Sequence, residues 1–460
     1  MLKSTLKASR IKLPISKFPS PYYHYATYLE NLSLRELEYA ANTLLRTFCE
    51  NNFDDSRNNY MKSEIEFLVT ILFKLFLCQA TNLHTLTIDK SFEFTDIPGT
   101  SVFSMPACLS RIVKLEIIFQ KTPNFLLLLE VLPSICTSIM NFSIQFPSAE
   151  TRLTDIENKV EDDARKKVAD IENDETICNN ISNIIRSQKN LQEFHVVGGN
   201  SVVGKFFSSL QYQFRNLRTL EFNSVNLSGV NLKDLSTFQT LKSLAFWNCQ
   251  EFTMNEAKSL MSPKYRLREL RLWSSRKSPG VTATIIKHVG RTVKKLWVDV
   301  LSPETIHAIA NYCPIVTDIR VLDYLPKQLP LLVKLLKEKR IEKLTISRET
   351  NVELGVINLT GRDFPEELKY LKLDCGVSAE QLEELLKGCK CELKTLIVSY
   401  FKVGIAHLKV ISEFAKSTKS LKILGVGGKQ EYSEKERMEL EMLHKNYGIY
   451  IIPLSDFDYW

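Results

Sequence analysis

A short apolar pattern recurs along most of the chain. It has apolar residues at the first, fourth and sixth positions of a six-residue run, as in LKSLAF from Leu241 and LRELRL from Leu267. The other copies begin at Leu83, Ile112, Ile139, Leu191, Leu217, Val293, Val316, Ile341, Leu368, Leu393 and Leu421. The copies follow one another at 23 to 29 residues, except for a gap of 52 residues between Ile139 and Leu191. This spacing is typical of leucine-rich repeats, whose period is about 20 to 29 residues.

Each run predicts a short β-strand, because its fourth and sixth residues fall on the same side of an extended chain. The stretches between the runs predict helices, since their apolar residues recur every three or four positions, as in 303–313, 378–389 and 407–417. One strand and one helix cannot enclose a core alone, so neighbouring repeats have to stack. The sequence therefore predicts an α/β fold: a leucine-rich-repeat solenoid with a parallel β-sheet on its concave face and helices on its convex face.

The two ends of the chain depart from the repeat. Residues 1–80 predict a helical N-terminal cap, in which Ser33 and Glu36 have the spacing of a capping box. Residues 81–454 make up the predicted solenoid, and residues 455–460 a short C-terminal tail. Terminal elements of a solenoid differ from its middle because they have to cover the exposed end of its core.

One internal segment, residues 148–176, is strongly charged and lies within the long gap between two copies of the pattern. Its apolar residues are spaced by three or four positions, at Leu153, Ile156, Val160, Ala164, Val168 and Ile171. This pattern predicts an insertion that forms either an amphipathic helix or a disordered charged loop.

The ten cysteines are scattered along the chain, which is typical of free thiols in a reducing compartment. We therefore expect the protein in the cytoplasm, the nucleus or both. Cys249 is the ninth residue of its repeat, a position at which leucine-rich repeats place Asn or Cys. Cys313 precedes a proline shortly before the next strand. Both are predicted to be buried structural thiols.

Three of the four tryptophans occupy outward positions of three consecutive predicted strands. Trp247 and Trp273 are seventh residues of their repeats, and Trp297 is the fifth residue of the next one, beside Arg271 on the neighbouring strand. Clusters of Trp and Arg dominate the energetics of protein interfaces. The same face is predicted to continue through His195, Asp299, Arg320, Asp323 and Tyr400. The alternative is that one or more of the rings fold over the edge of the solenoid and are structural.

The charge of this face bears on the kind of ligand, because the whole chain carries a net charge of +7. The basic residues at outward positions are Lys90, Lys114, Arg271, Lys295, Arg320, Lys343, Arg348 and Lys372. The acidic ones are Asp89, Glu116, Glu193, Glu221, Glu269, Asp299, Asp318, Asp323 and Asp374. A nearly balanced face does not suit a phosphate backbone, so we expect a protein or peptide ligand and no nucleic acid.

The sequence offers no catalytic motif. The pair in CKC at 389–391 has no second pair nearby, and GVGGKQ at 425–430 lacks the spacing of a phosphate-binding loop. The most apolar stretches, 67–78 and 125–135, are too short to span a bilayer. We expect no enzymatic activity, no cofactor, no metal ion and no membrane contact.

The cysteine-containing repeats LKSLAFWNCQEFTMNEAKSL and CPIVTDIRV resemble those of the fungal F-box and leucine-rich-repeat proteins. Residues 13–40 are similar to the junction that follows the F-box in that family. The resemblance implies a solenoid of the ribonuclease-inhibitor type that grips a substrate protein while the F-box docks on a Skp-type adaptor and a cullin. Here the prolines of KLPISKFPSP (12–21) prevent a prompt helix, so the F-box is missing or degenerate.

Two functions follow from these observations. The first is a substrate-recognition subunit of a ubiquitin ligase of the Skp, cullin and F-box type, which binds its target protein on the concave face. The second is a leucine-rich-repeat scaffold or inhibitor with no link to a ligase. In either case we expect a monomer outside its complex.

Overall fold

The fold is seen in a computed structural model of the 460-residue chain. The structure describes residues 26–49, 58–89, 97, 109–120, 122–146, 175–199, 202–260, 266–273, 279–299, 301–322, 328–347, 359–399, 403–427 and 432–454. The chain divides into two compact units. Unit 1 comprises Met1–Leu241 with Cys249–Glu251, and unit 2 comprises Lys242–Asn248 with Phe252–Trp460.

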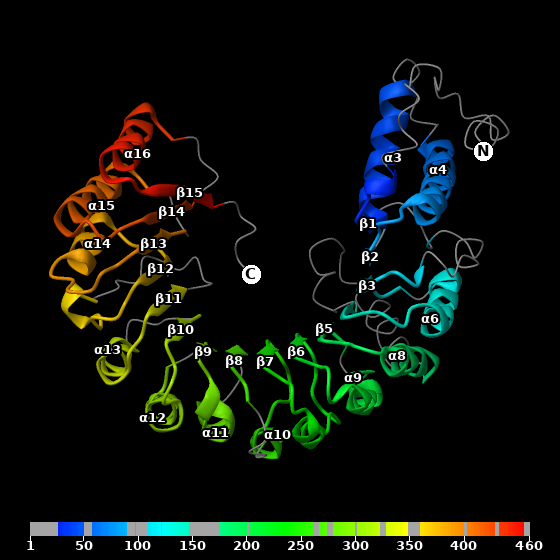
Figure 1. Cartoon of the computed structure of the whole chain (residues 1–460), viewed down its shortest axis with the longest axis horizontal. Coiled ribbons are helices and arrows are strands. Elements are labelled where there is room, and N and C mark those ends of the chain that lie inside the picture. Colours follow the sequence, from blue (N-terminus) through cyan, green and yellow to red (C-terminus); the bar gives the residue numbers. More distant parts are fainter. Residues whose placement is uncertain are drawn as a thin grey trace, which may run out of the picture. The chain divides into compact units, whose positions relative to one another are not determined.

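Unit 1 begins with a pair of helices and continues as strand-and-helix repeats (Figure 1). Its strands are β1 (Asn31–Ser33), β2 (Thr85–Ile88), β3 (Lys114–Ile118), β4 (Asn141–Gln145), β5 (Glu193–Val197) and β6 (Thr219–Asn223). Its helices are η2 (Ala26–Tyr28), α3 (Leu34–Cys49), α4 (Asn58–Gln79), α6 (Pro123–Ile135), α8 (Glu175–Ser187), α9 (Val202–Phe207), η6 (Ser208–Gln213) and η7 (Leu232–Thr237). Neighbouring strands from β1 to β6 pair in parallel and in chain order.

Unit 2 continues the repeats with a second run of parallel strands. These are β7 (Ser243–Trp247), β8 (Glu269–Trp273), β9 (Lys295–Val298), β10 (Asp318–Val321), β11 (Lys343–Ser347), β12 (Tyr370–Asp374), β13 (Thr395–Val398), β14 (Ile423–Gly427) and β15 (Tyr450–Leu454). The helices are α10 (Met254–Ser259), α11 (Pro279–Val289), η8 (Gly290–Thr292), α12 (Pro303–Tyr312), α13 (Leu329–Glu338), η10 (Gly361–Asp363), α14 (Ala379–Leu386), α15 (Ile405–Thr418) and α16 (Glu434–Tyr447). Each strand from β7 to β15 pairs in parallel with the next.

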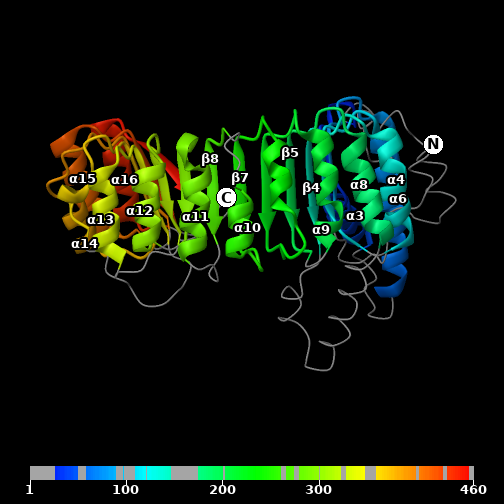
Figure 2. The same cartoon turned by 90° about the horizontal axis from the view of Figure 1, so that it is seen from below.

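The helices of unit 2 lie side by side along one side of its strands (Figure 1 and Figure 2), and none of the described helices lies on the other face of the sheet. We call the latter the open face; it corresponds to the concave face expected from the sequence. Fourth and sixth residues of each repeat, such as Leu244 and Phe246, are fully buried beneath the helices. Third, fifth and seventh residues point to the open face, because successive side chains of a strand alternate. The predicted fold class, an α/β leucine-rich-repeat solenoid, is confirmed.

Cys249 and Cys313 are buried, as the sequence predicts. The thiol of Cys249 donates a hydrogen bond to the carbonyl oxygen of Phe222 over 3.4 Å. Cys313 ends α12 and packs so closely on Gly290 that a Cβ there would lie 2.7 Å from its sulfur. Burial raises the pKa of the Cys313 thiol to about 12, so it stays protonated and inert. Both cysteines are structural packing residues.

Near the N-terminus the structure adds a strand that the apolar pattern does not predict. β1 lies within the segment expected to be helical, and it extends the sheet beyond β2. Ser33 at its end accepts a hydrogen bond from the backbone N–H of Glu36 and thereby caps α3. Residues 148–174 of the charged insertion lie outside the described residues, as does the tail 455–460. No described helix combines the length and the apolar composition needed to cross a bilayer.

Candidate functional site

The three tryptophans lie on three neighbouring strands of unit 2 and on its open face. The pairing of β7 with β8 sets Trp247 opposite Trp273, and the pairing of β8 with β9 sets Arg271 opposite Trp297. All four side chains are half-buried. Each of them is therefore partly exposed to solvent and partly covered by its neighbours. The prediction that these residues lie on neighbouring strands is confirmed.

The indole rings contact one another edge to face, with Trp247 in the centre. Its ring centroid is 5.3 Å from that of Trp273, at an interplanar angle of 80°, and 5.6 Å from that of Trp297, at 83°. Edge-to-face contacts at this distance favour the electrostatics of the rings and are worth about 0.5 to 1.5 kcal/mol beyond the area they bury. The cluster is consequently a rigid aromatic surface rather than three independent side chains.

Trp297 also stacks against two guanidinium groups, one from each neighbouring strand. The Cζ atom of Arg271 on β8 lies 4.3 Å from its ring centroid, and that of Arg320 on β10 lies 4.6 Å from it. The register explains the arrangement, because the fifth residues of these three repeats are paired directly across the sheet. Cation–π contacts of this kind hold the charged groups in place while leaving their N–H donors available.

The two arginines differ in their hydrogen bonding. Arg271 donates a hydrogen bond from Nε to Oε1 of Glu269 over 2.7 Å, and its Nη2 forms an ion pair with the same oxygen at 2.7 Å. Arg320 is more deeply placed, and its Nε is buried without a hydrogen-bond partner among the described residues. Burial lowers the pKa of Arg320, while the carboxylate of Asp374 acts in the opposite direction. An arginine keeps its charge under these conditions, so the site holds a fixed positive group.

Two acidic residues of the unit 2 face are buried, whereas Glu269 and Asp318 are half-buried like the arginines. Asp299 is 4% exposed and Asp374 is 1% exposed. Asp374 accepts hydrogen bonds from the hydroxyls of Ser347 (3.4 Å) and Ser399 (2.8 Å) on the adjacent strands. Burial raises the pKa of Asp318, although Lys343 and Lys295 lower it. Carboxylates covered in this way contribute little charge to an approaching ligand.

Two lysines of this face stay accessible, whereas the side chain of Lys372 is 11% exposed, with its ammonium nitrogen 3.9 Å from Asp374. Lys295 and Lys343 are exposed and lie on either side of Asp318 on β9 and β11. The sequence counted both lysines as basic but did not place them in the site. Tyr370, the third residue of its repeat on β12, was missed altogether; its ring lies 5.9 Å from the ammonium nitrogen of Lys343. The third position of the repeat is the signal that identifies these residues.

The remaining residues expected in the site do not join the tryptophan and arginine cluster. His195 lies on β5 of unit 1, with Nδ1 3.3 Å from a carboxylate oxygen of Glu221 and Nε2 3.9 Å from one of Glu193. Asp299 lies on the open face of unit 2 but is buried. Asp323 and Tyr400 lie outside the described residues. In the described part of the chain there is no group of three or more His, Cys, Asp or Glu placed to hold a metal ion.

Comparisons with known proteins add little to this picture. No family model matches the chain, and no curated protein matches it. Among solved structures, it is similar to a chain from the crystal structure of the Rad7 and Elc1 complex in yeast, with 13% sequence identity and a TM-score of 0.39 over 98% of each chain. Similarity at this level does not establish a shared function. What the geometry itself shows is an α/β solenoid of leucine-rich-repeat type with an aromatic and basic open face in unit 2.

Proposed function

We propose that this chain is a protein-binding module whose partner docks on the open face of β7 to β11 in unit 2. The observation that carries the proposal is the stacking of Trp297 between Arg271 and Arg320, joined edge to face to Trp247. Trp and Arg are the residues most enriched among those that dominate interface energetics. A solenoid with a hydrophobic core does not need them on its polar face, so their concentration there supports a binding role.

The cluster is also organised before a partner arrives. Its side chains project from paired strands, and each ring or guanidinium group is held by a neighbour 4.3 to 5.6 Å away. Ordering a flexible side chain on binding costs about 0.5 to 1.5 kcal/mol, and this cost is reduced when the side chain is already fixed. A small number of residues can therefore support a specific complex.

The charges of this face favour an acidic segment of the partner protein. Lys295 and Lys343 are the exposed charges of this face, Asp299 and Asp374 are buried, and the half-buried Glu269 is already paired with Arg271. The half-buried Asp318 lies between the two lysines. The four strands that carry Arg271, Lys295, Arg320 and Lys343 are β8 to β11. At a spacing of about 4.8 Å they cover roughly 15 Å, which matches the length of about five residues of extended chain. We infer that the partner presents a short extended segment in which carboxylates alternate with apolar or aromatic side chains. Complementary charge of this kind raises association rates and specificity.

For the biological role we propose a substrate-recognition subunit of a ubiquitin ligase. The cysteine-containing repeats that resemble those of the F-box and leucine-rich-repeat family support this, as does the helical pair α3 and α4 at the N-terminus. On α4, the apolar residues Leu72, Leu75 and Phe76 are only half-buried and offer a surface to an adaptor. We further propose that the protein has no enzymatic activity and resides in the cytoplasm or nucleus. The scattering of the ten cysteines along a long chain supports a reducing compartment.

A scaffold or inhibitor without a ligase is the second candidate, because the prolines of residues 12–21 argue against an intact F-box. Affinity purification of the tagged full-length chain from its native cells, followed by mass spectrometry, separates the two. We expect a Skp-type adaptor and a cullin in stoichiometric amounts. Their reproducible absence under gentle lysis would contradict the ligase role and leave the scaffold. A matched chain with Leu72, Leu75 and Phe76 replaced by Ser controls for the adaptor surface and should lose the adaptor while keeping the other partners.

A further inference from the structure

Two cysteines lie close together in the loop between α14 and β13, on residues that the proposed binding face does not use. The sulfur atoms of Cys389 and Cys391 are 2.7 Å apart, closer than two unbonded sulfurs ordinarily pack and longer than a disulfide bond of about 2.05 Å. Cys391 is buried at 3% exposure, whereas Cys389 is partly exposed. The pair therefore places an accessible sulfur directly in front of a protected one.

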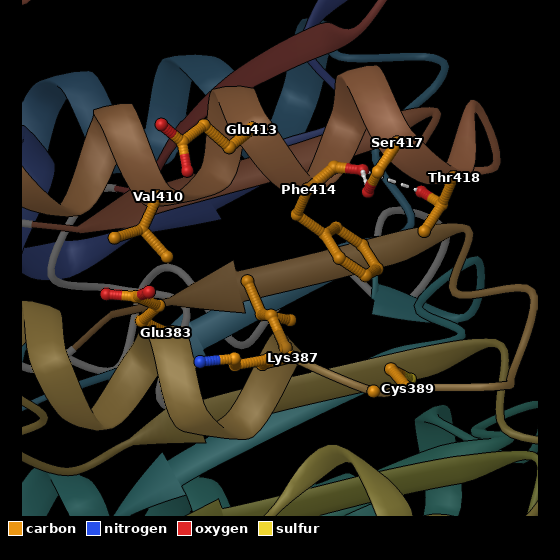
Figure 3. Close-up of a pocket in the computed structure, with 10 residues that line it drawn as sticks. Glu383, Lys387, Cys389, Val410, Glu413, Phe414, Ser417 and Thr418 are labelled. Carbon is orange, nitrogen blue, oxygen red and sulfur yellow. Dashed lines mark hydrogen bonds between the residues drawn. The ribbon is translucent and has the colours of Figure 1, made fainter.

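Cys389 opens onto a cavity of about 390 Å³ between α14 and α15. The cavity is also lined by Glu383, Lys387, Val410 and Phe414. Figure 3 shows Cys389 toward one end of this lining and Glu383 toward the other. A volume of this size admits a small molecule, and the mixture of charged and apolar side chains suits a polar one with a short aliphatic part.

The loop that carries the pair is held tightly by the fold. Gly388 has a φ of +74°, in the left-handed region that glycine adopts readily and other residues rarely do. A side chain at Gly361 would collide with the backbone of Lys387 and of Cys389, so η10 packs directly against the loop. The packing of the repeat thus fixes the backbone of the loop that carries Cys389.

The two thiols are unequal in acidity. The hydrogen bond from the Cys391 thiol lowers the pKa of Cys389 to about 7, although burial acts in the opposite direction. The same hydrogen bond, together with burial and the negative charge of Cys389, raises the pKa of Cys391. At neutral pH the thiolate is therefore the accessible sulfur. A thiol whose pKa lies near the ambient pH is the most effective attacking group in thiol–disulfide exchange.

We propose that Cys389 and Cys391 form a site of reversible thiol–disulfide exchange that reacts with small-molecule disulfides of the glutathione type. The Cys389 thiolate attacks one sulfur of the small disulfide, whose S–S bond breaks to release one small thiolate that takes a proton from water. Capping Cys389 removes the charge and the hydrogen bond that held the proton on Cys391. Cys391 then gives its proton to solvent and attacks the Cys389 sulfur. A second small thiol leaves, so that two cysteine thiols are oxidised and the small disulfide is reduced to two thiols.

The sequence provides a direct test, because Lys390 stands between the two cysteines. Trypsin cleavage after Lys387, Lys390 and Lys394 gives the peptides GCK and CELK, which stay joined only if the two cysteines form a disulfide. The folded full-length protein is incubated with oxidised glutathione at increasing ratios to reduced glutathione, alkylated, digested and analysed by mass spectrometry. We expect the joined peptide to appear before any other cysteine is oxidised, including the exposed Cys78.

Two variants resolve the order of the steps. Cys391→Ser should accumulate glutathione on Cys389, whereas Cys389→Ser should leave Cys391 unmodified; circular dichroism checks that both are folded. If either variant fails to fold, the experiment with the wild-type protein still tests the proposal. Oxidation of Cys78 before any joined peptide forms would overturn the proposal. So would an equal rate of joining in the urea-unfolded chain, because the fold would then contribute nothing.

Discussion

Units 1 and 2 are built from the same repeat but present different open faces. In unit 1 the outward residues of β3 to β6 include Glu116, Glu193 and Glu221 with His195, and none of them is Trp or Arg. In unit 2 the corresponding positions of β7 to β11 hold three Trp and two Arg side chains, with Lys295 and Lys343 next to the carboxylates of Glu269 and Asp318. The inward positions follow the same apolar pattern in both. The repeat thus determines where side chains point, and the third, fifth and seventh residues are left free to specify a ligand.

The cores of the two units also differ, in the size of the buried side chains. Around β4 and β5 the core is aromatic: the ring of Phe194 lies 5.5 Å from that of Phe142 and 6.2 Å from that of Phe206. Fourth positions of unit 2 instead hold aliphatic side chains, all fully buried, namely Leu244, Leu270, Leu296, Ile319, Leu344, Leu371, Leu396 and Leu424. Buried core residues are expected to stabilise each unit, whereas residues of the open face are expected to bind a partner. Substitutions can test the two groups separately.

The largest effect is expected where a core side chain is removed. Phe194→Ala should lower the free energy of unfolding of unit 1 by about 3 to 5 kcal/mol, because it leaves a large cavity between aromatic neighbours. Its sequence neighbour His195 points to the open face, so His195→Ala should change the free energy by less than about 0.5 kcal/mol. Urea unfolding followed by circular dichroism measures both. Similar losses in the two variants would show that the two faces of β5 are not distinguished as the repeat requires.

Replacing the tryptophans of unit 2 should affect binding far more than folding. Trp297→Ala removes the ring between Arg271 and Arg320 and should weaken partner binding by at least about 2 kcal/mol, roughly thirtyfold in Kd. The triple change of Trp247, Trp273 and Trp297 to Ala should abolish binding. Isothermal calorimetry with the purified partner measures the affinity, and thermal unfolding gives the control. A large fall in Tm with unchanged affinity would instead make the rings structural.

The sequence predicts many of the features that distinguish the two units. The features that it does not predict depend on contacts between repeats or on very short elements. The apolar period fixes which residues are inside, and it correctly placed Trp247, Trp273 and Arg271 on neighbouring strands. It does not show that Asp374 is covered by Ser347 and Ser399, since that depends on hydroxyl groups one repeat away on either side. The charge count made from the sequence therefore gives the number of charged residues on the face and not which of them are covered. The strand β1 was missed because its three residues are too few to display a period.

A smaller effect is expected from the exposed charges. Reversing Lys295 and Lys343 to Glu should slow association of an acidic partner by about tenfold at low ionic strength, and the difference should shrink in high salt. The matched control is Lys114→Glu, which changes a lysine at the same repeat position in unit 1 and should leave the rate unchanged. Stopped-flow measurements at several salt concentrations test this. An equal reduction in the control would show that net charge, and not the unit 2 face, governs association.

The smallest effect concerns Asp318, whose pKa is raised by burial against the opposing influence of Lys343 and Lys295. Because its protonated form favours the folded state, this contribution to stability is present at low pH and is lost as the pH rises through the folded pKa. Asp318→Asn, which stays neutral, should therefore be more stable than the wild type at neutral pH by less than about 1 kcal/mol. The difference should vanish near about pH 3. Unfolding curves at several pH values would contradict this if the variant were less stable at neutral pH.

The central claim is that the partner docks on the open face of unit 2, and site-specific photocrosslinking tests it most directly. A photoreactive amino acid is placed at Lys295 or, in a matched chain, at Lys114; both are exposed third residues of their repeats. We predict that only position 295 crosslinks the partner, through an acid-rich peptide identified by mass spectrometry, and that Trp297→Ala abolishes the crosslink. A crosslink of equal yield from position 114, or one from position 295 that survives Trp297→Ala, would contradict the account.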